Sequence, residues 1–225
     1  MCGRYTLTVD PAELREMLEL GELPPDLHPR YNIAPMQPVP VVTSAQDRNV
    51  EMYLWGLIPS WSKDPSMAGR MINARAESLA EKPAYRVPYQ RKRCLILADG
   101  FLEWKAEGDA KQPYFIQLAS RAPFAFAGLW DHWTAPDGKE KRTCTIITCP
   151  PNEFMTALHN RMPVILDKTV MWDWIDLAAS PVALRALLAP YAGALTAHPV
   201  SRLANKPAYD APDALKPERS ERETN

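Results

Sequence analysis

Prolines interrupt this chain along its whole length, with 23 among 225 residues. Proline has no backbone N–H and its ring clashes with the preceding helical turn, so it is excluded from helix interiors and from central positions of sheets. It is favoured in turns, where its fixed φ angle suits the first central position. The chain therefore cannot form a bundle of long helices, and we expect short elements joined by many ordered turns.

Apolar runs of strand length recur between these prolines. They cover residues 39–44, 50–57, 93–104, 112–119, 123–130 and 142–149, with a last short strand at 198–201. Amphipathic segments predict helices over residues 9–21, 151–159, 167–175 and 180–191. Residues 23–35 are interpreted as a proline-rich loop and residues 58–75 as a long irregular loop, a kind of segment that often carries function.

The order of these elements restricts the fold class. A regular alternation of strands and helices is absent, which argues against a doubly wound parallel sheet. The pattern predicts an α+β fold with a largely antiparallel β-sheet, a barrel-like core and peripheral helices. Residues 1–214 are expected to form a single domain, and the charged, proline-bearing residues 215–225 are expected to form a loose polar C-terminal tail.

Charge and cysteine content exclude several classes of function. The formal net charge is −1, so a nucleic-acid site would have to be a local patch. No apolar stretch approaches the ~20 residues of a membrane span, and no secretory leader is evident, so we expect a cytoplasmic protein with reduced thiols. Cys94, Cys144 and Cys149 lie in strand-like runs and are expected to be buried. Their spacing does not match a metal site, and no metal or other cofactor is expected.

Cys2 follows the initiator methionine, and this position carries a specific chemistry. Methionine aminopeptidases remove Met1 when the next side chain is small, which would leave Cys2 with a free α-amine and a thiol on adjacent carbons. An aldehyde would form an imine with the amine, and the thiol would then close a five-membered thiazolidine. The amine has a pKa of about 7.7–8.0, so part of it is already neutral at pH 7. The nearby Arg4 is expected to lower the thiol pKa.

Six short motifs occur in a fixed order along the chain and carry a resemblance to a known family. They are "MCGRY" at the start, "RYNIAP" (30–35), "MINARAE" (71–77), "ADGFLEWK" (98–105), "LHNRMPVIL" (158–166) and "HPVS" (198–201). In these motifs the chain resembles the SOS response-associated peptidase family, also known as abasic-site-shielding DNA–protein crosslink proteins. The resemblance runs from Met1 to about Asn205.

The resemblance implies a function and a set of catalytic residues. Members of the family crosslink abasic sites in single-stranded DNA through the terminal cysteine, and the crosslink shields the lesion; lyase-like and autopeptidase steps are also implied. By this resemblance Cys2 is the nucleophile. Glu103 manages protons during imine formation and ring closure, His159 protonates the sugar ring oxygen, and Asn73, in a loop, holds the terminal amine or the sugar oxygen.

The resemblance also implies DNA contacts. Arg4, Arg75 and Arg161 are the phosphate candidates, because guanidinium groups suit phosphate oxygens, and Thr148 offers a hydroxyl. Trp61 is expected to stack on a base or wedge the strand.

The chain departs from the family at one point. Many members carry an aromatic pair where this chain has Trp61 followed by Ser62. We expect less stacking surface and a weaker grip on DNA as a result. The expected partner is single-stranded DNA containing abasic sites, bound by a monomer that associates with the nucleoid only through DNA.

Two other functions remain compatible with the residues. An N-terminal-nucleophile amidohydrolase also exposes a cysteine by processing and uses its own amine as base. It predicts turnover of small amides and no stable DNA adduct. A module that binds damaged DNA without chemistry predicts that Cys2→Ala leaves binding intact.

Overall fold

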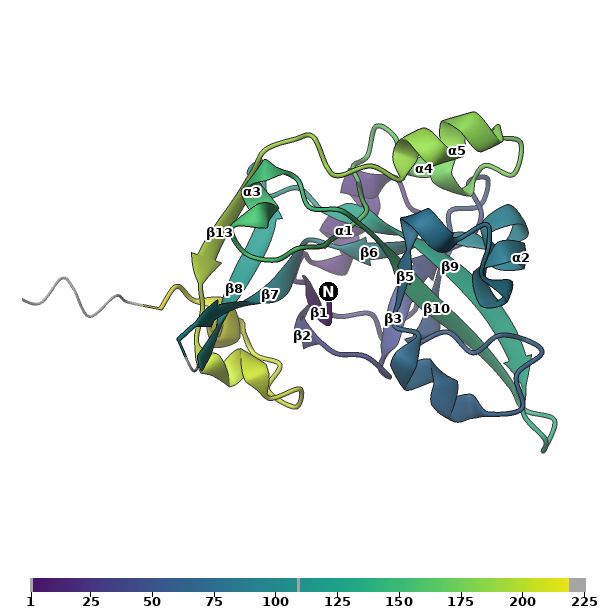
Figure 1. Ribbon diagram of the computed structural model, residues 1–225, viewed down its shortest axis with the longest axis horizontal. Helices are drawn as coiled ribbons and strands as arrows, with labels where there is room; N and C mark the ends of the chain where they lie inside the picture. Colours follow the sequence, from purple (N-terminus) through teal and green to yellow (C-terminus); the bar gives the residue numbers. More distant parts are fainter. Residues whose placement is uncertain (1, 109, 219–225) are drawn as a thin grey trace, which may run out of the picture.

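Two β-sheets form the body of the protein in the computed structural model, which describes residues 2–108 and 110–218 (Figure 1). The sheets hold five and eight strands, and nearly all strand pairs are antiparallel. Helices lie at the periphery. The predicted α+β class with a barrel-like core is confirmed. Within the described residues, no helix has the length and apolar character needed to cross a membrane.

The larger sheet closes into a five-stranded barrel, because β10 pairs with β9 as well as with β4. Every residue of β6 is buried, which accounts for its unbroken apolar sequence. The barrel strands, in order around the barrel, are β10 (Glu140–Cys149), β4 (Val50–Trp55), β3 (Pro38–Val42), β6 (Arg93–Ala98) and β9 (Phe124–Thr134). Three short strands extend this sheet: β5 (Asn73–Arg75), β11 (Met162–Pro163) and β12 (Ile165–Leu166).

The smaller sheet carries the beginning of the chain in its interior. Its order is β13 (Leu195–Pro199), β8 (Ala110–Leu118), β7 (Gly100–Glu107), β1 (Arg4–Leu7) and β2 (Arg30–Ile33). β1 pairs with β7 in a register that sets Arg4 opposite Leu102. β1 has a neighbouring strand on each side, and it lies near the middle of the view in Figure 1.

Asp99 forms the junction between the two sheets, where β6 passes into β7. Its buried carboxylate accepts hydrogen bonds from Thr6 Oγ1 (2.6 Å), Thr8 Oγ1 (2.6 Å) and the backbone of Val9 (3.1 Å). A Cβ on the next residue, Gly100, would lie 2.3 Å from the Phe115 ring, so only glycine fits this passage. These contacts fix the end of β1 against the barrel.

The helices are short, as the prolines predict. Asp10 accepts a hydrogen bond from Ala12 N (2.9 Å) and caps α1, which buries Leu14 and Leu18. The helices are α1 (Pro11–Leu18), α2 (Pro83–Arg91), α3 (Glu153–Thr156), α4 (Met171–Ile175) and α5 (Pro181–Leu187), with 3₁₀ helices at Pro65–Arg70, Ala76–Ser78, Arg202–Asn205 and Pro212–Leu215.

Several expected boundaries differ from the structure. The run 93–104 is two strands in different sheets. The expected irregular loop 58–75 contains a 3₁₀ helix and β5, and the proline-rich loop ends in β2. Helix α2 was not predicted. The expected tail begins later than residue 215, because Pro217 pairs with Val200 and Glu218 N donates to Pro199 O (2.9 Å). Residues 219–225 lie outside the described residues.

Candidate functional site

The first described residue, Cys2, lies beside Asn73, which is far from it in sequence. Its thiol has no solvent exposure, and its Sγ lies 3.7 Å from Arg4 O. The Asn73 side chain donates a hydrogen bond from Nδ2 to Cys2 O at 2.9 Å. Asn73 begins β5, not a loop as expected, and parallel pairing with β10 sets it opposite Ile146. The barrel therefore holds the amide that anchors the N-terminal segment.

A cleft of about 530 Å³ opens next to Cys2. It brings together segments that are distant in sequence: the start of β1, the middle of β7, the start of β8, the turn after α3 and the C-terminal segment. Its lining residues are Gly3, Arg4, Glu103, Trp104, Lys111, His159 and Asn205. Three of the predicted site residues, Arg4, Glu103 and His159, thus share one cleft, and Cys2 and Asn73 lie beside it.

Glu103 and Cys2 are both buried, and burial governs their acidity. Burial raises the pKa of Glu103, which is 3% exposed, although the charge of His159 acts in the opposite direction. Burial and the negative charge of Glu103 raise the pKa of the Cys2 thiol. A hydrogen bond with the Arg4 backbone lowers this pKa, but burial outweighs it, so the expected low thiol pKa is wrong for the chain that still carries Met1. The thiol needs a base to become nucleophilic, and Glu103 is the neighbouring candidate.

His159 is oriented by the backbone that follows it. Its Nδ1 lies 3.0 Å from the N–H of Arg161 and 3.2 Å from Arg161 O. The ring is thus anchored through Nδ1 to the turn between α3 and β11. Half-burial in the cleft keeps the imidazole in reach of a bound molecule. Histidine is the side chain most often used as a general acid or base in catalysis.

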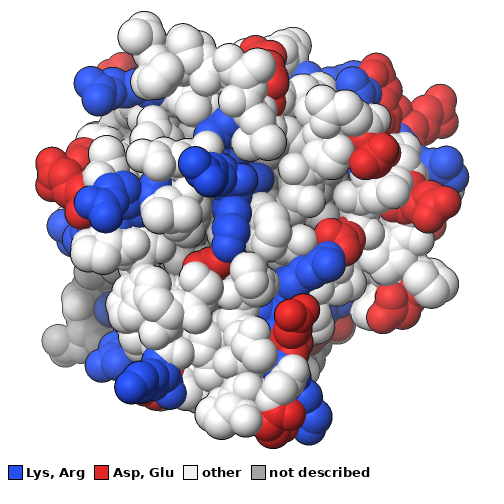
Figure 2. Space-filling model, turned by 90° about the vertical axis from the view of Figure 1, so that its right-hand side faces the viewer, with Lys and Arg blue, Asp and Glu red and all other residues white. Residues whose placement is uncertain are grey.

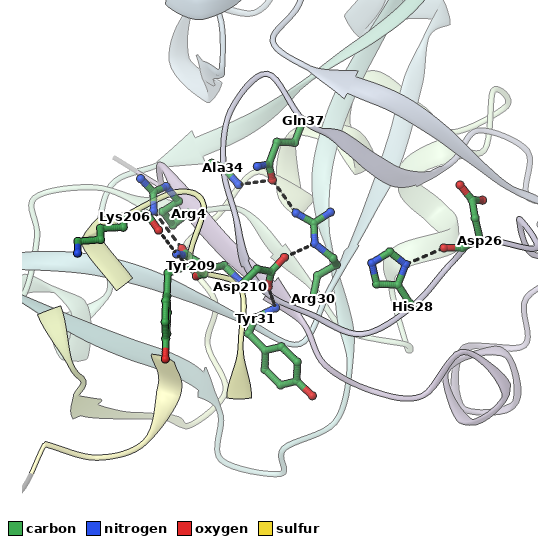
Figure 3. A network of polar contacts seen from close by, with 11 residues as sticks. Arg4, Asp26, His28, Arg30, Tyr31, Ala34, Gln37, Lys206, Tyr209 and Asp210 are labelled. Carbon is green, nitrogen blue, oxygen red and sulfur yellow. Dashed lines mark hydrogen bonds and ion pairs between the residues drawn. The ribbon is translucent and has the colours of Figure 1, made fainter. Parts of the chain in front are cut away.

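Arg4 forms one wall of the cleft, and a polar network holds it there (Figure 3). Its Nη1 donates to Asn32 Oδ1 (3.0 Å) and Ala204 O (2.9 Å), and its Cζ lies 5.8 Å from the centre of the Trp104 ring. Trp104 Nε1 in turn donates to Asn205 Oδ1 at 2.7 Å. These contacts leave Arg4 half-buried at the rim, where a phosphate contact remains a prediction.

Sequence reasoning missed the residue at the centre of this network. Asn32 is fully buried, and its Nδ2 donates to the carbonyls of Ala204 (3.2 Å), Lys206 (3.0 Å) and Tyr209 (2.8 Å). The signal was available, because Asn32 lies inside the motif "RYNIAP". Lys111 and Asn205 were also missed, and both line the cleft.

Arg161 and Thr148 occupy positions that differ from a simple phosphate site. Arg161 forms a bidentate ion pair with Glu77 and donates to Thr148 O at 2.6 Å. Thr148 is fully buried, and its Oγ1 lies 3.5 Å from Ala74 O and 3.3 Å from Arg161 Nη2. Thr148 thus packs in the sheet and supports Arg161, and its contact with a phosphate stays a prediction. Arg75 lies exposed on β5.

Trp61 is 61% exposed and lies on an anchored loop. It is not one of the described residues that line the cleft. The flanking backbone is fixed on both sides. Ser60 N donates to Asp131 Oδ2 (2.8 Å), and Trp133 Nε1 donates to Ser62 O (2.6 Å). Ser62 is buried, and its backbone oxygen anchors the loop to Trp133. The Trp61 side chain is accessible for stacking.

The surface charge of the molecule is mixed. Figure 2 shows Lys and Arg gathered near the centre of one face, with Asp and Glu interspersed around them. Among the described residues, no group of three His, Cys, Asp or Glu side chains is placed to hold a metal ion. The cleft is lined by the carboxylic acid of Glu103 and the imidazole of His159, and the buried Cys2 thiol and the Asn73 amide lie beside it. These groups can manage protons while a carbonyl compound reacts with the amino end of the chain.

The fold and cleft define a class: an α+β barrel protein that places an N-terminal cysteine among acid–base side chains. The SOS response associated peptidase (SRAP) family matches residues 1–207. The chain belongs to this family.

Its relatives carry informative names. "Abasic site processing protein YoqW" of Bacillus subtilis is 42% identical over 221 residues, which cover 96% of this chain and 99% of the relative. "Abasic site processing protein HMCES" of Gallus gallus is 32% identical over 265 residues, covering 96% and 78%. A crystal structure of a protein from Bacteroides thetaiotaomicron superposes with a TM-score of 0.87 at 26% identity, covering 97% of this chain and 100% of that one.

Proposed function

We propose that this protein processes abasic sites in single-stranded DNA by forming a covalent thiazolidine through Cys2 after Met1 is removed. The observation that supports the proposal is that Glu103 and His159 line one cleft, with Cys2 bonded to Asn73 beside it, in a chain whose relatives are named for abasic-site processing. The ring-opened sugar of an abasic site supplies an aldehyde, the group with which adjacent amine and thiol nucleophiles react.

The reaction balances without an oxidant or reductant. The Cys2 amine attacks the aldehyde carbon, and loss of one water gives an imine. The thiol then adds across the C=N bond: sulfur bonds to carbon, and the thiol proton ends on nitrogen. Glu103 supports both steps because its raised pKa lets it donate a proton to the leaving hydroxyl and then, as carboxylate, take one from the thiol. His159, anchored through Nδ1, assists opening of the sugar ring.

Asn73 has a fixed role in this scheme. Its Nδ2 holds the Cys2 carbonyl, which orients the amine on the same residue. Its buried Oδ1 has no hydrogen-bond partner among the described residues. A buried acceptor left in this way costs free energy, so a donor from the amine or from the sugar would stabilise the complex. The amide thus suits both the nucleophile and its substrate.

The decisive experiment uses protein whose intact mass confirms loss of Met1, mixed with a single-stranded oligonucleotide that carries one abasic site. We expect a heat-stable shifted band on a denaturing gel. Cys2→Ala should abolish that band yet give an adduct when borohydride reduces the imine, because its amine remains. Cys149→Ala, a buried cysteine away from the cleft, is the matched control and should crosslink normally.

The result also separates the two alternatives. An amidohydrolase would hydrolyse small amides and leave the oligonucleotide unshifted. A binding module would shift the oligonucleotide only on a native gel, equally with Cys2→Ala. An unshifted denaturing band with fully processed protein would refute the proposal.

A further inference from the structure

A second cleft of about 420 Å³ adjoins the first across the turn that joins His159 to Arg161. It lies where β5 leads into the 3₁₀ helix Ala76–Ser78 and onward to the start of α2. Its lining residues are Arg75, Glu77, Ser78, Glu81, Lys82 and Arg161. Three cations and two carboxylates thus face one another beside the cleft that holds the catalytic candidates.

The Glu77 carboxylate binds both terminal nitrogens of the Arg161 guanidinium. Arg161 Nη1 donates to Glu77 Oε1 (2.5 Å) and Nη2 to Oε2 (3.0 Å), a bidentate arrangement. Phosphates bind arginine through the same pair of parallel hydrogen bonds. A phosphate can therefore take this face of Arg161 only when the Glu77 carboxylate leaves it. The bond to Arg161 also lowers the pKa of Glu77, which keeps the carboxylate ionised at neutral pH.

The two partners differ in how firmly they are held. The Arg161 side chain is 15% exposed and is bonded to Thr148 O at 2.6 Å, whereas the Glu77 side chain is 51% exposed and sits on a single short turn. Glu77 is thus the partner that can swing away. Arg161 Nε is buried without a hydrogen-bond partner among the described residues, so the paired state leaves one donor unsatisfied.

We propose that Glu77 is a specificity-determining residue that masks Arg161 as an internal substitute for a DNA phosphate. The inference rests on the proposed function. While Glu77 is bound, the Arg161–Glu77 pair has no net charge. Arg161 then neutralises no phosphate, so an approaching DNA strand releases no counterion at this position. Undamaged DNA is then held weakly, and retention depends on the covalent step at Cys2. The near-neutral net charge of the chain agrees with this division of labour.

The test measures binding of an intact single-stranded oligonucleotide, without any abasic site, by fluorescence anisotropy over a series of salt concentrations. Glu77→Gln should bind about 3- to 10-fold more tightly than the wild type at low salt, because one arginine becomes available to phosphate. The slope of log K against log salt should steepen by about 0.7, the value for one additional phosphate contact on a single strand. Adding Arg161→Ala to Glu77→Gln should remove both gains.

Glu81→Gln is the matched control. Glu81 lines the same cleft and carries the same charge, but its side chain forms no ion pair among the described residues. It should give a smaller gain in affinity and an unchanged slope. Weaker binding by Glu77→Gln, or a slope equal to that of Glu81→Gln, would overturn the inference.

The two proposals fail separately. If wild-type protein crosslinks an abasic oligonucleotide but Glu77→Gln gains no affinity for intact DNA, only the masking role is lost. If the wild type never crosslinks, the proposed function is lost whatever the salt slopes are. A thermal melt of Glu77→Gln, expected to match the wild type closely because Glu77 is half-exposed, shows that the fold is intact.

Discussion

Glu103 is a carboxylic acid held almost entirely out of water at the edge of the cleft. Because burial raises its pKa in the folded state, folding binds its proton more tightly than the unfolded chain does. The stability that this group provides is fully present below the unfolded-state pKa of about 4.3. It is lost as the pH rises through the higher folded-state value. Glu103, which the proposed mechanism needs, therefore lowers the free energy of unfolding at neutral pH.

Glu103→Gln keeps the shape of the side chain and removes the buried charge. We expect its melting temperature to exceed that of the wild type at pH 7, by about 2–4 °C for each kcal/mol gained in a chain of this size. The difference should shrink toward pH 4, where most of the wild-type acid is protonated in both states. Melts from pH 4 to 8 check this, with the exposed Glu13→Gln as control. A difference that grows toward low pH would contradict it.

The motif resemblance singled out Cys2, Asn73, Glu103 and His159, and their catalytic roles stay predictions. The motifs did not indicate which side chains would pair with one another. That Arg161 binds Glu77 depends on β5 running parallel to β10, a pairing between short segments that the sequence alone does not indicate.

At the scale of elements, Arg93 joins two helices to the barrel. It begins β6, is 3% exposed, and uses its guanidinium to satisfy backbone carbonyls at two helix ends. Nε donates to Trp174 O (2.7 Å), Nη1 to Tyr89 O and Gln90 O (2.9 Å each), and Nη2 to Asp176 O (2.8 Å). These carbonyls belong to the C-terminal ends of α2 and α4, where a cation is also favoured by the helix dipole.

Arg93→Met should therefore destabilise the fold by about 2–4 kcal/mol, because several buried carbonyls lose their donors. Arg93→Lys should recover part of this at most, since a single ammonium cannot span two helix ends. Denaturant unfolding measures both. Arg91→Met, on the exposed end of α2, should stay within about 0.5 kcal/mol of the wild type, and an equally small effect at Arg93 would refute the role given to it.

Pro88 explains why α2 was not predicted from the sequence. This helix contains Pro88, which removes one intrahelical hydrogen bond and disfavours a helix from local sequence alone. Arg93 supports the helix from outside, at the carbonyls of Tyr89 and Gln90 near its C-terminal end. The long apolar strands, by contrast, were found from sequence because burial on both faces leaves an unbroken apolar run. Short strands such as β1, β2 and β5 have too few residues to show a period.

At the scale of the whole molecule, residues 204–210 near the C-terminus bind strands β1 and β2 of the smaller sheet. We call this segment the strap. Asp210 accepts hydrogen bonds from the backbone N–H groups of Tyr31 (2.5 Å) and Asn32 (3.0 Å) and forms an ion pair with Arg30 (Figure 3). Consecutive N–H groups share one carboxylate because the pairing of β2 with β1 is irregular at this point. Through Asn32 the strap also supports Arg4 at the cleft. Residues near the two ends of the chain therefore build one wall together.

Asp210→Ala should weaken this wall. We expect faster hydrogen exchange at the amides of Tyr31 and Asn32 and a loss of about 1–3 kcal/mol in the free energy of unfolding. Asp137→Ala, in the exposed turn between β9 and β10, should change neither quantity and serves as control. Unaltered exchange at Tyr31 and Asn32 would show that the strap does not secure β2.

The position of that strap has a consequence for solubility. β2 is the outermost strand of its sheet, and an uncovered edge offers unpaired amides on which a strand of another molecule can add. Asp210 takes two of those amides and places a negative charge along the edge. This disfavours the pairing of β2 with an edge strand of another copy of the protein, even at the high concentrations reached during overproduction.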